Sequence, residues 1–121
     1  MIIMKIIIKV EGKGEAIAEL DNRNPKIAKA IYDSLPIYNR ALRWLDELFF
    51  ETEVTMNDEN PSKTAEIGDI SYWGPGYAFC IFFGDTPPYS EVNHIGKITE
   101  NLELFFNSDE GDRIIVRKYE E

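Results

Sequence analysis

Residues 66–87, which read EIGDISYWGPGYAFCIFFGDTP, decide the fold. Two runs rich in aromatic and β-branched residues flank a Gly-Pro-Gly turn at positions 74–76. This pattern predicts two strands, residues 70–73 and residues 77–83. The second run is apolar at consecutive positions, so we expect both of its faces to be covered and the strand to be central in a sheet.

Six further strands are predicted on either side of this segment from short apolar runs bounded by glycine, proline or polar clusters. They cover residues 2–10, 15–20, 37–43, 48–55, 92–98 and 113–119. Eight strands in 121 residues leave unpaired edges unless the sheet closes on itself. We therefore expect a mostly β fold, a closed eight-stranded barrel, in which residues 1–121 form a single domain.

One main helix is predicted from Pro25 to Leu35. Asn24 precedes it as the expected N-cap, and proline suits the first helical position. Apolar residues at positions 27, 31 and 35 form a stripe that we expect to lie on the barrel mouth, and a proline at position 36 ends the helix. A short helical turn is expected near Asn101 to Phe106.

The charge balance argues against several partners. The chain has 22 acidic and 13 basic residues and a net charge of −9, so we expect no nucleic-acid partner. Lys5 and Lys9 interrupt the apolar N-terminal run, and no stretch approaches the roughly 20 apolar residues of a membrane helix, so no membrane partner is expected. The lone cysteine, Cys80, excludes an intramolecular disulfide and indicates a reducing, cytoplasmic location.

Neither nucleophilic nor metal chemistry is indicated. Cys80 lies inside an apolar strand, where burial raises the pKa of a thiol and removes the reactive thiolate, so we expect it to be inert. One histidine and one cysteine provide no metal-ligand spacing, and the glycine turns lack the spacing of phosphate-binding loops. The sequence therefore predicts no metal and no cofactor.

The segment at residues 66–87 resembles the small prokaryotic cyclophilin-like domains, a family of unsettled function. The likeness extends over nearly the whole chain, including Trp44 after the helix and the NHIGKI stretch at residues 93–98. The resemblance implies an eight-stranded cyclophilin-like β-barrel with short helices at its ends.

Residues 95–102, IGKITENL, are also similar to the Phe-Gly-Lys-Val-x-Glu-Gly-Met stretch of the true cyclophilins, which are prolyl isomerases. Such an enzyme needs an apolar proline pocket and a guanidinium that binds the prolyl nitrogen in the twisted state. The family's Arg, Gln and His pattern is not matched, because residues 39–44 lack a Phe-His-Arg motif and the chain has no glutamine. The pocket histidine falls on Val92, and His94 lies two residues later on the same strand face.

We expect a binding module that takes an extended peptide or a small apolar ligand in a groove on the barrel side. Arg40 is preferred to Arg43 as the donor, and Trp73, beside the glycine turn, is the aromatic residue most expected to line the groove. The candidate residues are Arg40, Trp44, Tyr72, Trp73, Phe79 and His94. Two alternatives stay open: a peptidyl-prolyl isomerase with a rearranged active site, and a structural protein assembled as a homodimer rather than a monomer.

Overall fold

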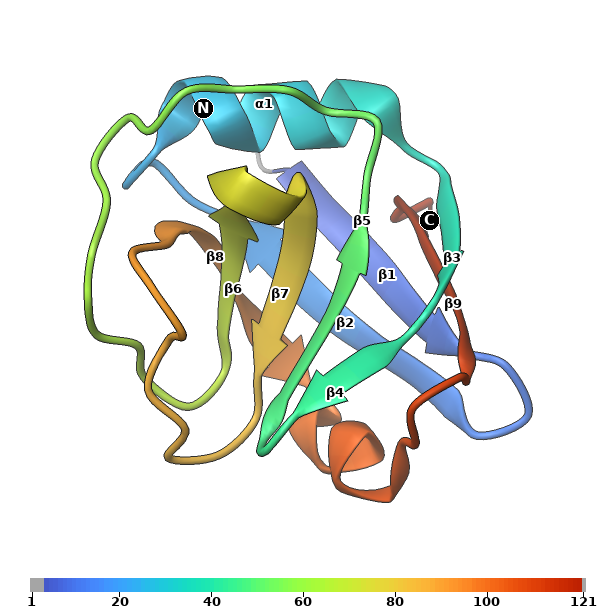
Figure 1. Ribbon diagram of the computed structural model, residues 1–121. Coiled ribbons are helices and arrows are strands. Elements are labelled where there is room, and N and C mark those ends of the chain that lie inside the picture. Colours follow the sequence, from blue (N-terminus) through green and yellow to red (C-terminus); the bar gives the residue numbers. More distant parts are fainter. Residues whose placement is uncertain (1–3, 121) are drawn as a thin grey trace.

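A nearly closed antiparallel β-barrel with one helix across an end is shown in Figure 1, a computed structural model that describes residues 4–120. The strands in this range are β1 (Met4–Val10), β2 (Gly14–Leu20), β3 (Ile37–Arg40), β4 (Leu42–Trp44), β5 (Glu47–Glu51), β6 (Asp69–Trp73), β7 (Ala78–Phe82), β8 (Asn93–Glu100) and β9 (Arg113–Lys118). The helices are α1 (Pro25–Ser34) and the 3-10 turns η1 (Gly74–Gly76) and η2 (Leu102–Asn107). The sheet order is β3-β9-β1-β2-β8-β6-β7-β5-β4.

The mostly β barrel is confirmed, with nine strands in the described residues instead of eight. The extra strand arises because the predicted strand 37–43 bends at Ala41. The N–H of this buried residue donates to the Asp112 carbonyl oxygen at 2.8 Å, and its own carbonyl accepts from the Gly111 N–H at 2.8 Å. One half of the bent segment pairs with β9 and the other with β5, so the bend closes the barrel. The first two residues of the predicted strand 2–10 lie outside the described residues.

The segment at residues 66–87 is central, as predicted: β6 lies between β8 and β7, and β7 lies between β6 and β5. All five residues of β7 are buried. Phe79 and Ile81 point into the main core inside the barrel. Ala78, Cys80 and Phe82 point outward and form a second cluster with Val92. The run that is apolar on both faces therefore belongs to two cores, one inside the barrel and one on its outer side.

Helix α1 covers one end of the barrel (Figure 1). Its Ile27, Ala28 and Ile31 side chains are buried. It ends at Ser34, one residue before the predicted end. The segment after β5 runs across this helix and down the side of the barrel before it enters β6 (Figure 1).

Asn24 occupies the predicted N-cap position, and its carbonyl oxygen accepts from the Ala28 N–H at 2.9 Å, but the predicted side-chain cap is wrong. Its side chain makes no capping bond. The buried amide donates from Nδ2 to the His94 carbonyl oxygen at 2.8 Å, and its Oδ1 accepts from the Asn60 N–H at 2.6 Å. The Glu59 carboxylate replaces the cap, because it accepts from the Lys26 backbone N–H at the start of the helix at 3.2 Å. Asn24 therefore ties the helix entry to β8 and to the long segment between β5 and β6.

Replacement of Asn24 by aspartate keeps the side-chain shape but turns the donor facing the His94 carbonyl into an acceptor. We expect Asn24→Asp to lower the free energy of unfolding at pH 7 by about 2–4 kcal/mol, because a buried carbonyl loses its partner beside a buried charge. The matched control is Asn57→Asp, the same substitution at an exposed position, which should lower the free energy of unfolding by less than about 0.5 kcal/mol. Urea unfolding measures both, and equal effects would contradict the role given to Asn24.

Candidate functional site

A groove of about 390 Å³ opens on the outer side of the barrel. Trp44 and Glu47 are directly paired between β4 and β5, so they share one face of the sheet. Phe49 lies two residues after Glu47 on that face, because side chains alternate along a strand. Residues from the end of β6 and from the loop between β7 and β8 complete the groove, whose lining includes Trp44, Glu47, Phe49, Trp73, Tyr89 and Val92.

Three aromatic rings wall this groove. Tyr89 lies edge-on to Trp44, with ring centroids 6.0 Å apart and planes at 82°, and edge-on to Trp73 at 6.0 Å and 81°. This edge-to-face geometry is a favourable arrangement of aromatic pairs. The Trp73 Nε1–H donates to Ser90 Oγ at 2.7 Å, which ties the indole to the loop that carries Tyr89. Although Tyr89 is 73% exposed, its contacts join two tryptophans from separate strands.

Glu47 is a buried carboxyl group at this apolar wall, with 6% of the residue exposed. Burial raises its pKa from the usual 4.5 to about 7, and a hydrogen bond from the Cys80 thiol opposes part of this rise. The thiol has a second acceptor within reach, the Ala78 carbonyl oxygen at 3.8 Å. A carboxyl group with such a pKa can exchange a proton near neutral pH, and once ionised it can pair with a cation.

Cys80 is buried, as predicted. Burial raises the pKa of its thiol well above the usual value, and the charge of Glu47 and a hydrogen bond to it raise it further. The thiol is therefore neutral at physiological pH and acts as a hydrogen-bond donor rather than as a nucleophile.

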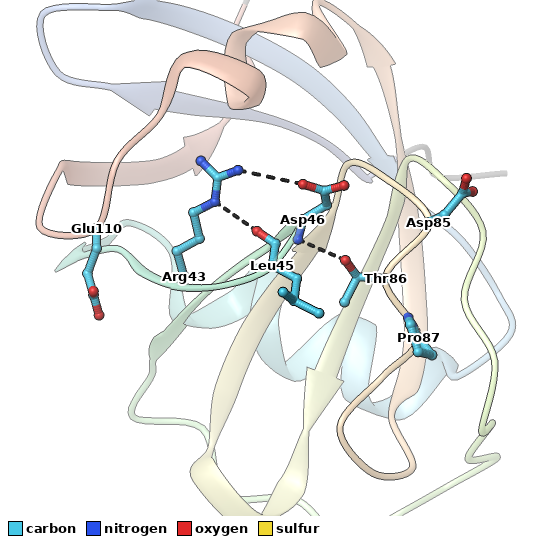
Figure 2. Close-up of a pocket in the computed structure, with 7 residues that line it drawn as sticks. All are labelled: Arg43, Leu45, Asp46, Asp85, Thr86, Pro87 and Glu110. Carbon is cyan, nitrogen blue, oxygen red and sulfur yellow. Dashed lines mark hydrogen bonds and ion pairs between the residues drawn. The ribbon is translucent and has the colours of Figure 1, made fainter.

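Arg43 also borders the groove, but its guanidinium is engaged elsewhere. Its Nε donates to the Leu45 carbonyl oxygen at 2.8 Å, its Nη1 donates to that of Ser108 at 3.0 Å, and its Nη2 lies 3.6 Å from the Asp46 carboxylate. Figure 2 shows Arg43, Leu45 and Asp46 at a neighbouring depression, which has a volume of about 670 Å³. The Asp46 N–H there donates to Thr86 Oγ1 at 2.8 Å. Four of the residues that line the depression, Arg43, Leu45, Asp46 and Thr86, thus already bond to one another.

The four predicted aromatic site residues divide between the groove and the core. Trp44 and Trp73 line the groove. Tyr72 and Phe79 are fully buried inside the barrel, and the Tyr72 hydroxyl donates to the Val54 carbonyl oxygen at 2.6 Å.

Arg40 and His94 do not line the groove and lie far apart in the sheet. The strand that carries Arg40, β3, is separated from β8 by β9, β1 and β2. Arg40 is exposed and donates to the Gly111 carbonyl oxygen at 3.2 Å. The structure therefore does not bring together the arginine and the histidine that the sequence suggested for a rearranged isomerase site.

The His94 imidazole is held on both sides. Its Nε2 lies 2.6 Å from the Thr64 carbonyl oxygen, which can only accept, so Nε2 donates, and its Nδ1 forms a hydrogen bond with the Ser71 hydroxyl at 2.7 Å. The Asp69 carboxylate lies 3.7 Å from that same Nδ1. In a hydrolytic triad the acid and the nucleophile bind different ring nitrogens, so these residues form a structural network and not a triad.

Sequence reasoning did not single out Glu47 and Tyr89. Glu47 precedes the predicted start of its strand, and Tyr89 lies in a loop without periodicity. One signal was present: Phe49 falls on the outer face of β5, which an exposed strand would fill with polar residues as at Glu51. Val92, where the resemblance places a pocket histidine, does line the groove.

The fold and the comparisons agree on the class of protein. The chain belongs to the cyclophilin-like family, which matches residues 4–117. It is similar to the hypothetical protein AF2241 from Archaeoglobus fulgidus, with which it shares 36% sequence identity. The solution structure of that protein matches with a TM-score of 0.83, and the match covers 97% of this chain and 95% of that one. The predicted resemblance is therefore confirmed.

A second solved structure, McbB in complex with tryptophan, has a TM-score of 0.82 at 15% identity. The match covers 96% of this chain and 45% of that chain, and at this identity it shows a shared fold. A search of curated proteins finds no significant match. Within residues 4–120, no three His, Cys, Asp or Glu side chains are placed to hold a metal ion, and no helix has the length and apolarity to cross a membrane.

The raised pKa of Glu47 predicts a loss of stability with rising pH. The folded state holds the proton up to about pH 7 and the unfolded state only to about pH 4.5, so the free energy of unfolding falls as pH rises through this window. We expect Glu47→Gln to remove this fall, so that its free energy of unfolding at pH 8 exceeds that of the wild type by about 3 kcal/mol. Urea unfolding from pH 4.5 to 8 tests this, with the exposed Glu51→Gln as the matched control on the same strand.

Proposed function

We propose that this cyclophilin-like domain is a binding module that takes a small apolar ligand or part of an extended peptide into the groove beside Trp44, Trp73 and Tyr89. The observation that carries the proposal is a set of three aromatic rings that line an open concavity, with Tyr89 packed edge-on against both tryptophans. Binding sites are typically concave and apolar, with a few polar groups that orient the ligand. Here Glu47 supplies such a group.

The size of the groove supports a small occupant. Its volume of about 390 Å³ is near the lower end of the roughly 300–1,000 Å³ found for ligand pockets. A single apolar side chain or a small molecule suits this volume.

The groove is also backed by a well-packed sheet. Phe49 and Trp73 pack on the outer cluster that contains Cys80 and Phe82. An ideal Cβ at Gly76 would lie 2.7 Å from two ring carbons of Trp73, so the glycine lets the indole lie close against the turn. Such support holds the ring in place before a ligand arrives and lowers the entropy cost of binding.

Prolyl isomerisation and assembly as a homodimer stay predictions, because no contact described above favours either. The site residues Arg40, Tyr72, Phe79 and His94 likewise stay predictions. Of the six site residues predicted from the sequence, Trp44 and Trp73 line the groove, which supports their role in binding.

The two tryptophans of the chain both line the groove, so their two indole N–H signals in a ¹H–¹⁵N spectrum report on it directly. We expect members of a library of apolar fragments and proline-containing peptides to shift both signals. Gly76→Ala should weaken binding at least about fivefold, because the new methyl group displaces the Trp73 ring. Gly74→Ala in the same turn is the control, since its Cβ would find its nearest neighbour at 3.6 Å. A library that shifts neither indole would refute the proposal.

A further inference from the structure

We infer that the groove recognises a small alkylammonium ligand, with the rings of Trp44, Trp73 and Tyr89 facing its alkyl groups and the Glu47 carboxylate facing its charge. This inference rests on the proposed function, because it specifies the chemical class of ligand for the same groove.

The aromatic wall has the geometry that such a cation requires. The face of an aromatic ring carries negative electrostatic potential, and tryptophan is the strongest of these partners for a cation. Tyr89 is nearly perpendicular to both Trp44 and Trp73. The three rings therefore do not stack into one flat surface, and all three line the concavity.

The groove also contains a group whose negative charge is complementary to that of an alkylammonium ligand, the Glu47 carboxylate. The lining contains two charged residues, Arg43 and Glu47. The guanidinium of Arg43 is bound by two carbonyl oxygens and lies beside the Asp46 carboxylate, so its charge is already matched. Among residues 4–120, no lysine or arginine forms an ion pair with Glu47, so its carboxyl group has no cationic partner in the described part of the chain. The net charge of −9 also attracts cations to the protein as a whole.

Other ligand classes fit the same atoms less well. A neutral apolar ligand would bury the Glu47 carboxyl group further without giving it a partner, which costs free energy. An anion would meet both this carboxyl group and the negative faces of the rings. A volume of about 390 Å³ favours a small molecule over a long peptide. A compact cation with an alkyl surface satisfies the rings and the carboxylate together.

The titration of Glu47 should therefore be coupled to binding. A bound cation favours the carboxylate and lowers a pKa that burial holds at about 7, so binding releases a proton and strengthens between pH 6 and pH 8. The other titratable or charged groups facing Glu47 are Arg43 on β4, Cys80 on β7 and Tyr89 of the following loop. Burial raises the pKa of the Cys80 thiol and keeps it neutral throughout this range.

Choline and its neutral isostere 3,3-dimethylbutan-1-ol test the inference, because they share a shape and differ in charge. Each is titrated at pH 8 into the full chain while the two indole signals are followed. We expect choline to bind at least about tenfold more tightly than the alcohol. Glu47→Gln should weaken choline binding about tenfold, whereas Glu51→Gln, the same charge change on the same strand outside the groove, should leave it unchanged.

A pH series separates the charge of Glu47 from other effects. Choline affinity should rise between pH 6 and pH 8 in the wild type and stay flat in Glu47→Gln. A rise that persists in Glu47→Gln would assign the titration to another group and would overturn the role of Glu47. Thermal unfolding of each variant verifies that it is folded.

The outcomes distinguish this inference from the proposed function. Equal affinity for choline and the alcohol would overturn the cation preference and leave an apolar binding groove. The cation preference is also overturned, and the apolar groove kept, if choline and the alcohol both fail to bind while a library fragment or peptide shifts the indole signals. If no compound of either set shifts them, both conclusions are overturned.

Discussion

The requirement that both faces of β7 be covered governs this structure. A strand with alternating polar residues can leave one face in water, but β7 has apolar side chains on both sides, and each needs a packing partner. The barrel interior covers Phe79 and Ile81, and the loop that carries Val92 helps to cover Cys80 and Phe82 on the outer side. The loops over the outer face therefore belong to the hydrophobic core as much as the strands do.

The candidate site is a consequence of that second layer. In the loop after β7, Tyr89 contacts Trp44 and Trp73, and all three rings line the groove. The strand position that would be polar and solvated in an uncovered sheet is occupied by Glu47, which is buried there instead. The same packing that stabilises the outer face thus places a carboxyl group in an apolar setting and shifts its pKa toward neutrality.

Local sequence rules predicted the features that depend on neighbouring residues. They missed features that depend on contacts between residues far apart in the chain. Helix α1 begins at Pro25 as its proline indicates, because the fixed backbone angle acts locally. Asparagine is a common N-cap residue, yet the side-chain amide of Asn24 bonds to His94 and Asn60, which lie far along the chain. The bend at Ala41 likewise depends on a turn at residues 111–112, so periodicity within residues 37–43 could not show it.

By itself, the sequence determined the β-rich class, the central aromatic segment, the position of the helix and the family, because apolar periodicity, turn residues and a long specific motif are all encoded locally. It also indicated Trp44 and Trp73. Only the tertiary structure decided that Glu47 and Tyr89 join them while Arg40 and His94 do not. A groove on the outer side of a barrel depends on the register of paired strands and on the path of a loop, and both are set by contacts between residues far apart in the chain.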